Sequence, residues 1–93
     1  MSSGYKFKTN SQLKNAVKKW CKNKKSAKKK YGGINTWDVS KIEDFSELFK
    51  DKSNFNSNIS NWDVSNGSSF EGMFDNAKKF NKDIGKWDVS NGT

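Results

Sequence analysis

The chain has 93 residues, among them 18 lysines, no arginine and no histidine, and its formal net charge is +8. The lack of histidine excludes histidine-based metal sites and catalytic triads, and the lack of arginine excludes bidentate guanidinium recognition of phosphate. A single cysteine excludes an internal disulfide, and no apolar run approaches the roughly 20 residues that cross a bilayer.

The positive charge is concentrated in the first third of the chain. Residues 1–33 contain 11 lysines and no acidic residue, whereas residues 34–93 contain 7 lysines and 10 acidic residues, a formal charge of −3. Regions of opposite sign within one chain indicate an interaction role. By length the whole chain is expected to form one domain.

The basic region predicts two short helices. Thr9 and Gln12 match a capping box, in which a hydroxyl and an amide satisfy free backbone donors at a helix start. The residues that follow form one apolar stripe at helical spacing: Leu13, Ala16, Val17, Trp20 and Cys21. On this stripe Cys21 is expected to be a small buried residue. A second helix is expected over residues 24–30, ended by two glycines.

From residue 34 onward the sequence repeats every 25 residues. The tetrapeptide Trp-Asp-Val-Ser begins at Trp37, Trp62 and Trp87, and isoleucine and phenylalanine residues recur in register around it. A fixed period of this length is typical of stacked-repeat proteins. We therefore divide the chain into a basic helical cap at 1–33, repeat 1 at 34–58, repeat 2 at 59–83 and partial repeat 3 at 84–93.

Each repeat predicts a short strand, a tight turn and a helix of about two turns. Ile-x-x-Trp-x-Val places tryptophan and valine on one face of an extended segment. Phe45, Leu48 and Phe49 then follow at helical spacing, as do their counterparts in repeat 2. Asn66-Gly67 is expected to adopt positive φ in the turn between strand and helix. The predicted fold class is α/β repeat, with an N-terminal amphipathic helical cap before about two and a half strand-turn-helix repeats.

Stacking such units buries a continuous column of side chains that a single unit could not bury alone. The predicted core positions are Trp37, Val39, Phe45, Phe49, Trp62, Val64, Phe70, Phe74, Trp87 and Val89. Asp38, Asp63 and Asp88 alternate with inward residues, so we expect them to point outward or to cap turns. Their spacing lacks a dedicated loop of ligands for Ca²⁺, and the sequence predicts no metal and no cofactor.

The repeat pattern, Ile-x-x-Trp-Asp-Val-Ser followed by Phe-x-x-Met/Leu-Phe and Phe-Asn, closely resembles the BspA-like leucine-rich-repeat surface protein family. The lead-in at residues 13–20 and 31–34 resembles the helical cap that precedes such arrays. The resemblance implies a leucine-rich-repeat-like solenoid used for adhesion or protein–protein contact, with no catalytic residues. Two copies depart from the family pattern, because Asn66-Gly67-Ser68 and Asn91-Gly92-Thr93 lack its inward valine, and we expect these turns to be loosened.

A block of lysines in the cap is the candidate site for an anionic partner. It comprises Lys18, Lys19, Lys22, Lys24, Lys25, Lys28, Lys29 and Lys30. Such a block can hold phosphates electrostatically without reading sequence, and acidic proteins are a further class of partner. The ordinary role of a lysine run is a solvated helix face.

These features favour a non-enzymatic repeat protein, a structural or protein-interaction module in a larger surface or virion-like assembly. The third repeat stops before its helix would begin, so its exposed apolar groups predict a protein partner or self-association at this open C-terminal end. The alternative is a basic accessory protein that binds nucleic acid or an anionic surface through residues 18–30. The first eight residues do not resemble a signal peptide, and cell surface, virion and intracellular assembly all stay open as locations.

Overall fold

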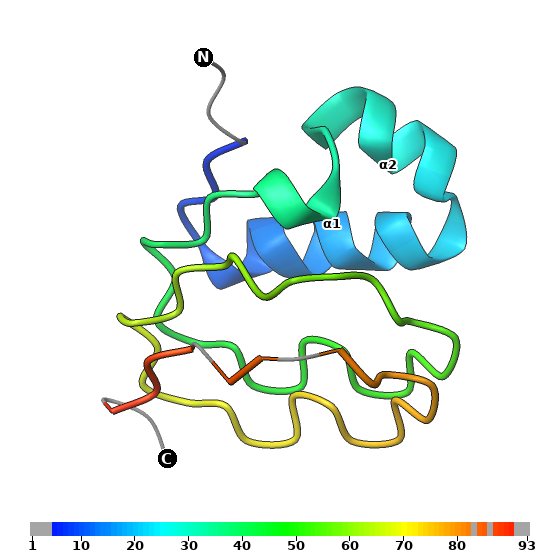
Figure 1. The fold of residues 1–93 in the computed structure, drawn as a ribbon. Helices are drawn as coiled ribbons and strands as arrows, with labels where there is room; N and C mark the ends of the chain where they lie inside the picture. Colours follow the sequence, from blue (N-terminus) through cyan, green and yellow to red (C-terminus); the bar gives the residue numbers. More distant parts are fainter. Residues whose placement is uncertain (1–4, 83, 86, 91–93) are drawn as a thin grey trace.

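The computed structural model describes residues 5–82, 84–85 and 87–90. Helices α1 (Asn10–Lys22) and α2 (Lys24–Tyr31) lie together on one side of the molecule, followed by the short 3-10 helix η1 (Ile34–Thr36). The chain after Thr36 runs back and forth beneath α1 in successive winding layers (Figure 1). The helices therefore cover one end of the stack that the later residues form.

Helix α1 begins where the sequence predicts. The Thr9 side chain accepts a hydrogen bond from the backbone N–H of Gln12 at 3.2 Å. The Gln12 side-chain oxygen accepts from the backbone N–H of Lys8 at 2.9 Å, one residue before the position that a capping box requires. Four residues of the apolar stripe are buried: Leu13, Ala16, Val17 and Trp20.

Cys21, the fifth residue of the stripe, is exposed, so the expectation that it would be buried is wrong. It lies in the last turn of α1, where the helix leaves the core. Asn23 follows and caps both the end of α1 and the start of α2. Its backbone N–H donates to the carbonyl of Lys19 at 2.7 Å and its side-chain oxygen accepts from the backbone N–H of Ser26 at 3.1 Å. The chain therefore turns from α1 into α2 within one residue.

The predicted α/β fold of strand-turn-helix repeats, with its leucine-rich-repeat-like solenoid, is wrong for this chain. After Thr36 the described residues contain no strand and no α-helix. Two isolated parallel bridges join Lys6 to Asp38 and Asp44 to Ser69. The repeats are instead built from turns and irregular chain that stack on one another.

The segment expected to be the helix of repeat 1 is a run of consecutive β-turns, here called the first turn segment (residues 44–52). The backbone N–H groups of Leu48, Lys50 and Lys52 donate to carbonyls three residues earlier, whereas an α-helix joins residues four apart. Glu47 and Asp51 have φ of 58° and 63°, a left-handed conformation that breaks a helix. A positive φ at the third position is the mark of a type II turn.

The same turns recur in repeat 2, in the second turn segment (residues 69–77), and the two segments run side by side in the same direction. Gly72 and Asn76 there have φ of 64° and occupy the positions equivalent to Glu47 and Asp51. Four backbone N–H groups of the first segment donate to carbonyls of the second at 2.8–2.9 Å: Phe45 to Ser69, Glu47 to Glu71, Phe49 to Met73 and Asp51 to Asp75. These bonds hold repeat 2 against repeat 1.

The tryptophans of the three Trp-Asp-Val-Ser copies form a column of stacked rings. The indole N–H of Trp62 donates to the carbonyl of Ile34 at 2.8 Å, and that of Trp87 donates to Ile59 at 3.1 Å. The ring of Trp62 stacks between the other two, with centroids 6.3 and 6.5 Å away. Because a buried indole needs an acceptor, each of these two tryptophans fastens its own repeat to the preceding one.

Phenylalanine rings form the remaining columns. The stacked pairs are Phe45–Phe70, Phe49–Phe74 and Phe55–Phe80, with centroids 5.4, 5.5 and 5.7 Å apart. Gly67 is buried beside the first pair. A Cβ there would lie 2.5 Å from Phe70 Cζ and 2.9 Å from Phe45 Cδ2. Two phenylalanine rings therefore occupy the space that a side chain at position 67 would need.

The expectation of positive φ at Asn66-Gly67 is wrong, because neither residue has φ in the left-handed region. Glycine is required at position 67 for space and not for backbone conformation. The other sequence of this kind, Asn91-Gly92-Thr93, lies outside the described residues.

Candidate functional site

The repeat core is closed at the end covered by α1 and open at the other end. Six predicted core residues are buried: Trp37, Val39, Phe45, Phe49, Trp62 and Val64. Their counterparts farther from α1 are less covered, since Phe70, Phe74 and Trp87 are half-buried. Val89 is 47% exposed, against 1% for Val39 and Val64. Equivalent side chains thus lose their cover with distance from the cap.

The uncovered side chains surround an apolar hollow of about 600 Å³, which we call the open end. It is lined by Phe70, Gly72, Met73, Phe74, Asp75, Ile84, Trp87 and Val89. Exposed apolar side chains that gather around a hollow can mark a site of protein–protein contact or ligand binding. The open end is therefore the first candidate site.

Beside this hollow lies a row of backbone N–H groups that sequence reasoning missed. The N–H groups of Phe70, Gly72, Phe74 and Asn76 correspond to the four donors that join repeat 1 to repeat 2. Among the described residues these four N–H groups have no acceptor. A row of unpaired backbone donors can bind an incoming polypeptide segment.

One signal in the sequence could have revealed the row. Gly72 falls inside the predicted helix of repeat 2, and Asn76 follows four residues later. Glycine and asparagine adopt positive φ most readily, so this spacing indicates turns better than a helix. Repeat 1 hides the signal, because its equivalent residues are Glu47 and Asp51.

The second candidate site is the basic surface, defined as the eight lysines between positions 18 and 30. Lys19 is half-buried and the other seven are exposed. In the part of the chain that the structure describes, the one salt bridge joins Lys50 to Glu47 at 3.5 Å, so the basic surface has no ion pair there. Lys24 and Lys30 extend over the rings of Trp20 and Tyr31, 5.4 and 5.3 Å from the centroids.

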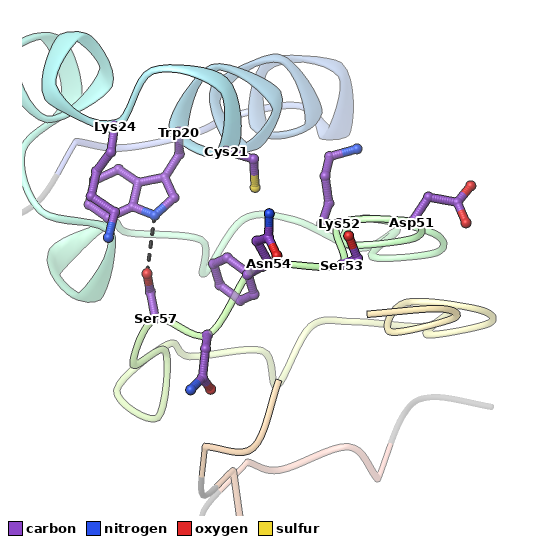
Figure 2. Close-up of a pocket in the computed structure, with 10 residues that line it drawn as sticks. Trp20, Cys21, Lys24, Asp51, Lys52, Ser53, Asn54 and Ser57 are labelled. Atoms are coloured by element: carbon purple, nitrogen blue, oxygen red, sulfur yellow. Dashed lines mark hydrogen bonds between the residues drawn. The ribbon is translucent and has the colours of Figure 1, made fainter. Parts of the chain in front are cut away.

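A polar cleft separates the end of α1 from residues 51–57 (Figure 2). The indole N–H of Trp20 donates to the Ser57 hydroxyl at 3.2 Å across it. The Cys21 sulfur points toward the opposite wall (Figure 2). Although the residue as a whole is exposed, partial desolvation of the thiol by the walls of the cleft raises its pKa above the ordinary value of 9.0, and Lys52 and Lys24 oppose the rise. A thiol of raised pKa is a poor nucleophile.

The aspartates of the three Trp-Asp-Val-Ser copies each hold a turn. Asp38 accepts hydrogen bonds from the hydroxyl and the backbone N–H of Ser40 at 2.6 and 3.0 Å. These bonds lower the pKa of Asp38, and the equivalent bonds from Ser90 lower the pKa of Asp88. Within the described residues, no three potential metal ligands lie close enough together to hold a metal ion.

No α-helix in the described part of the chain has the length and apolar character needed to span a membrane. No curated protein and no solved structure matches the chain. A family match covers residues 11–93, which include most of the helical cap and all three Trp-Asp-Val-Ser copies, and it is consistent with the BspA-like resemblance of these residues. By this match the chain belongs to the family described as Mycoplasma protein of unknown function, DUF285.

Proposed function

We propose that the chain is a non-enzymatic interaction module that binds another polypeptide through its open end. The resemblance to BspA-like surface proteins favours a place in a larger assembly, at a cell surface or in a virion. In this function the helical cap closes one end of the stack and the repeats present the other end to a partner.

The observation that carries the proposal is the uncovered core at the open end. Val89 is 47% exposed where Val39 and Val64 are 1% exposed, and Trp87 and Phe74 are half-buried beside it. Covering this apolar surface is favourable by about 25 cal/mol per Å². The free backbone N–H groups at the edge add directional bonds that an apolar ligand alone would leave unsatisfied.

The titratable groups favour a structural role over a catalytic one. Asp38 and Asp44 have lowered pKa values, and in each case a serine two residues later supplies the responsible hydrogen bonds. A general base needs a pKa near the working pH, and the hydrogen bonds move the pKa of these two carboxyls further below that pH. The raised pKa of Cys21 likewise disfavours a thiolate nucleophile.

Footprinting of the protein inside its native assembly tests the proposal. Oxidative labelling would compare Trp87 and Phe74 in the intact source material with the same residues in the isolated 93-residue chain. We expect labelling of both to fall at least severalfold in the assembly, while that of the buried Trp37 stays low in both samples. Unchanged labelling of Trp87 and Phe74 would contradict the proposal.

A second candidate function is binding to nucleic acid or another anionic surface through the basic surface. The supporting observation is that these lysines have no ion-pair partner among the described residues. Chemical acetylation of Lys22, Lys25 and Lys29, which are all exposed, would be lower in the assembly than in the isolated chain if this function holds. Binding to DNA, RNA or anionic vesicles would also weaken steeply with salt, and binding that ignores salt would exclude it.

A further inference from the structure

Asn66 and Gly67 form a pair of residues in which the asparagine side chain is chemically labile. The backbone nitrogen of the residue after an asparagine can attack the side-chain amide carbon, and glycine favours this attack because it has no Cβ to obstruct it. The bond from nitrogen to Cγ forms as the bond from Cγ to Nδ2 breaks, and the side-chain nitrogen leaves as ammonia with the proton of the attacking N–H. Water then opens the succinimide ring, which leaves aspartate or isoaspartate at this position.

The fold engages both reacting groups of this pair. The backbone N–H of Gly67, which would supply the nucleophile, donates to the carbonyl of Val64 at 2.9 Å. The side-chain nitrogen of Asn66, which would be the leaving group, donates to the carbonyl of Ser40 at 2.7 Å. A bonded backbone N–H is protected from losing its proton to solvent. The bond to Ser40 holds the Asn66 side chain against the rotation that would bring Cγ onto the nitrogen.

The surroundings of Gly67 leave no room for the ring. Gly67 is buried although Asn66 is exposed. A Cβ at position 67 would lie 2.5 Å from Phe70 Cζ and 2.9 Å from Phe45 Cδ2, so the residue is enclosed by one ring from each repeat. Closing the succinimide ring must turn the peptide group of Gly67 within this space. The reaction therefore requires repeats 1 and 2 to separate at this point.

The same turn in repeat 1 carries different residues. Lys41 and Ile42 occupy the positions equivalent to Asn66 and Gly67, and the backbone N–H of Ile42 donates to the carbonyl of Val39 at 3.0 Å. The turn bond is thus a feature of the repeat, and the labile pair is an addition made in repeat 2. The bond from Asn66 to Ser40 also joins repeat 2 to repeat 1, because the two residues are 26 positions apart.

From these contacts we propose that Asn66 is a site of spontaneous deamidation that the fold protects and that reacts when repeat 2 separates from repeat 1. The product opposes the return of the contact. An ionised aspartate side chain has only acceptors, so it would place a carboxylate oxygen against the Ser40 carbonyl. Isoaspartate would add a backbone carbon beside the enclosed Gly67. A transient separation of the two repeats thereby becomes permanent, and this inference does not depend on the proposed interaction role.

Peptide mapping of the 93-residue chain after incubation in mildly alkaline buffer tests the inference. Mapping distinguishes position 66 from the second pair of this kind, Asn91-Gly92, which lies outside the described residues. The unfolded reference is a peptide copying residues 62–71 in the same buffer. Deamidation is slow compared with opening and closing, so its rate in the folded chain follows the population of the open form. We expect conversion in the chain to be at least tenfold slower than in the peptide, and equal rates would overturn the proposal.

Guanidinium chloride at concentrations below the unfolding transition tells separation of the repeats from complete unfolding. Separation of repeats 1 and 2 exposes only part of the buried surface, so the deamidation rate should rise with denaturant less steeply than the global unfolding constant. A slope equal to that of global unfolding would place the reaction in the fully unfolded chain. That result would overturn the inference that separation of the repeats is sufficient.

A pair of variants tests the effect of the product. Asn66→Asp introduces the carboxylate at the position that donates to Ser40, and Asn61→Asp makes the same change at another exposed position of repeat 2. The reporter is the backbone N–H of Ser68, which donates to the carbonyl of Glu43 in repeat 1 at 2.7 Å. We expect its hydrogen exchange to become at least severalfold faster in Asn66→Asp and to stay nearly unchanged in Asn61→Asp. Equal exchange in the two variants would contradict the role of Asn66 in holding the repeats together.

Discussion

Repeats 1 and 2 share a sequence pattern, yet their equivalent side chains have different surroundings. Phe45 and Phe49 belong to the turn segment that is joined to α1 through Asp44 and to repeat 2 through its backbone, and both are 0% exposed. Phe70 and Phe74 occupy the same positions and have a full layer on one side only, so they are half-buried. Burial in this molecule is set by what is stacked on a repeat as well as by its sequence.

The hydrogen bonds show the same difference. Four donors of the first turn segment, the N–H groups of Phe45, Glu47, Phe49 and Asp51, are satisfied by repeat 2, whereas the four equivalent donors of the second segment have no acceptor among the described residues. The comparison indicates that each repeat is completed by its neighbour, and that the proposed interaction surface is the side of repeat 2 that has no such neighbour among the described residues. Substitutions at equivalent positions in the two repeats test this difference.

The largest expected effect is from Phe49→Ala. The ring is fully buried and stacks on Phe55 and Phe74 at 4.2 and 5.5 Å, so its removal should cost about 3–5 kcal/mol of unfolding free energy. Phe74→Ala is the matched variant at the open end, and its loss should be at most about 2 kcal/mol because the ring is already partly in water. Urea denaturation measures both, and equal losses would contradict the difference in burial.

Gly67→Ala should cost about 1–3 kcal/mol, because the new methyl would overlap the rings of Phe45 and Phe70. The added Cβ would lie closest to the half-buried Phe70 ring, at 2.5 Å, and 2.9 Å from the buried Phe45 ring. Combining Gly67→Ala with Phe70→Ala therefore tests which ring resists. We expect the glycine substitution to cost less in the double variant, as measured by a double-mutant cycle. An unchanged cost would show that the Phe70 ring contributes nothing to the clash.

Thr9→Ala should weaken the cap by about 1 kcal/mol, since it removes the hydroxyl that accepts from Gln12 at the start of α1. In a domain of this size the loss corresponds to a fall in Tm of roughly 4–8 °C. Ser11→Ala, on an exposed residue in the same helix, is the control and should leave Tm nearly unchanged. If the two variants have the same Tm, the hydrogen bond of the Thr9 hydroxyl does not stabilise the end of the stack that α1 covers.

The smallest expected effect is a pH dependence from Asp38. Hydrogen bonds from Ser40 hold the pKa of this carboxyl below its ordinary 3.8, so ionised Asp38 favours the folded state. That contribution is fully present above pH 3.8 and is lost as pH falls through the lower folded pKa. Ser40→Ala should raise the pKa of Asp38 toward 3.8 in an NMR titration and flatten the fall in stability with acid. A pKa that does not move on substitution would assign the shift to another cause.

The repeat period and the cap could be predicted from the sequence because both depend on local spacing. Thr9, Leu13 and Trp20 follow helical rules within a single segment, and the first helix forms almost where they indicate. The Trp-Asp-Val-Ser copies recur in register, and the buried Trp37 and Trp62 do form one column. Features that depend on the residues of one segment alone can therefore be predicted from the sequence.

The internal structure of the repeat could not be predicted, because two structures share one apolar spacing. Phe45, Leu48 and Phe49 fall on one face both in a helix and in a run of β-turns. In the first turn segment the turns leave N–H groups that pair with the next repeat, a contact that no single segment shows. Glu47 and Asp51 have positive φ although residues of these types adopt it rarely. The residue types of repeat 1 therefore do not indicate the turns. The free donor row at the open end follows from the same turns and was missed with them.

Hydrogen exchange of the free 93-residue chain tests the central claim most directly. The backbone N–H groups of Phe45, Glu47, Phe49 and Asp51 are bonded to repeat 2, whereas their counterparts at Phe70, Gly72, Phe74 and Asn76 have no acceptor in the part of the chain that the structure describes. We predict strong protection of the first four amides and near-unprotected exchange of the second four. Equal protection of the two sets would contradict the account.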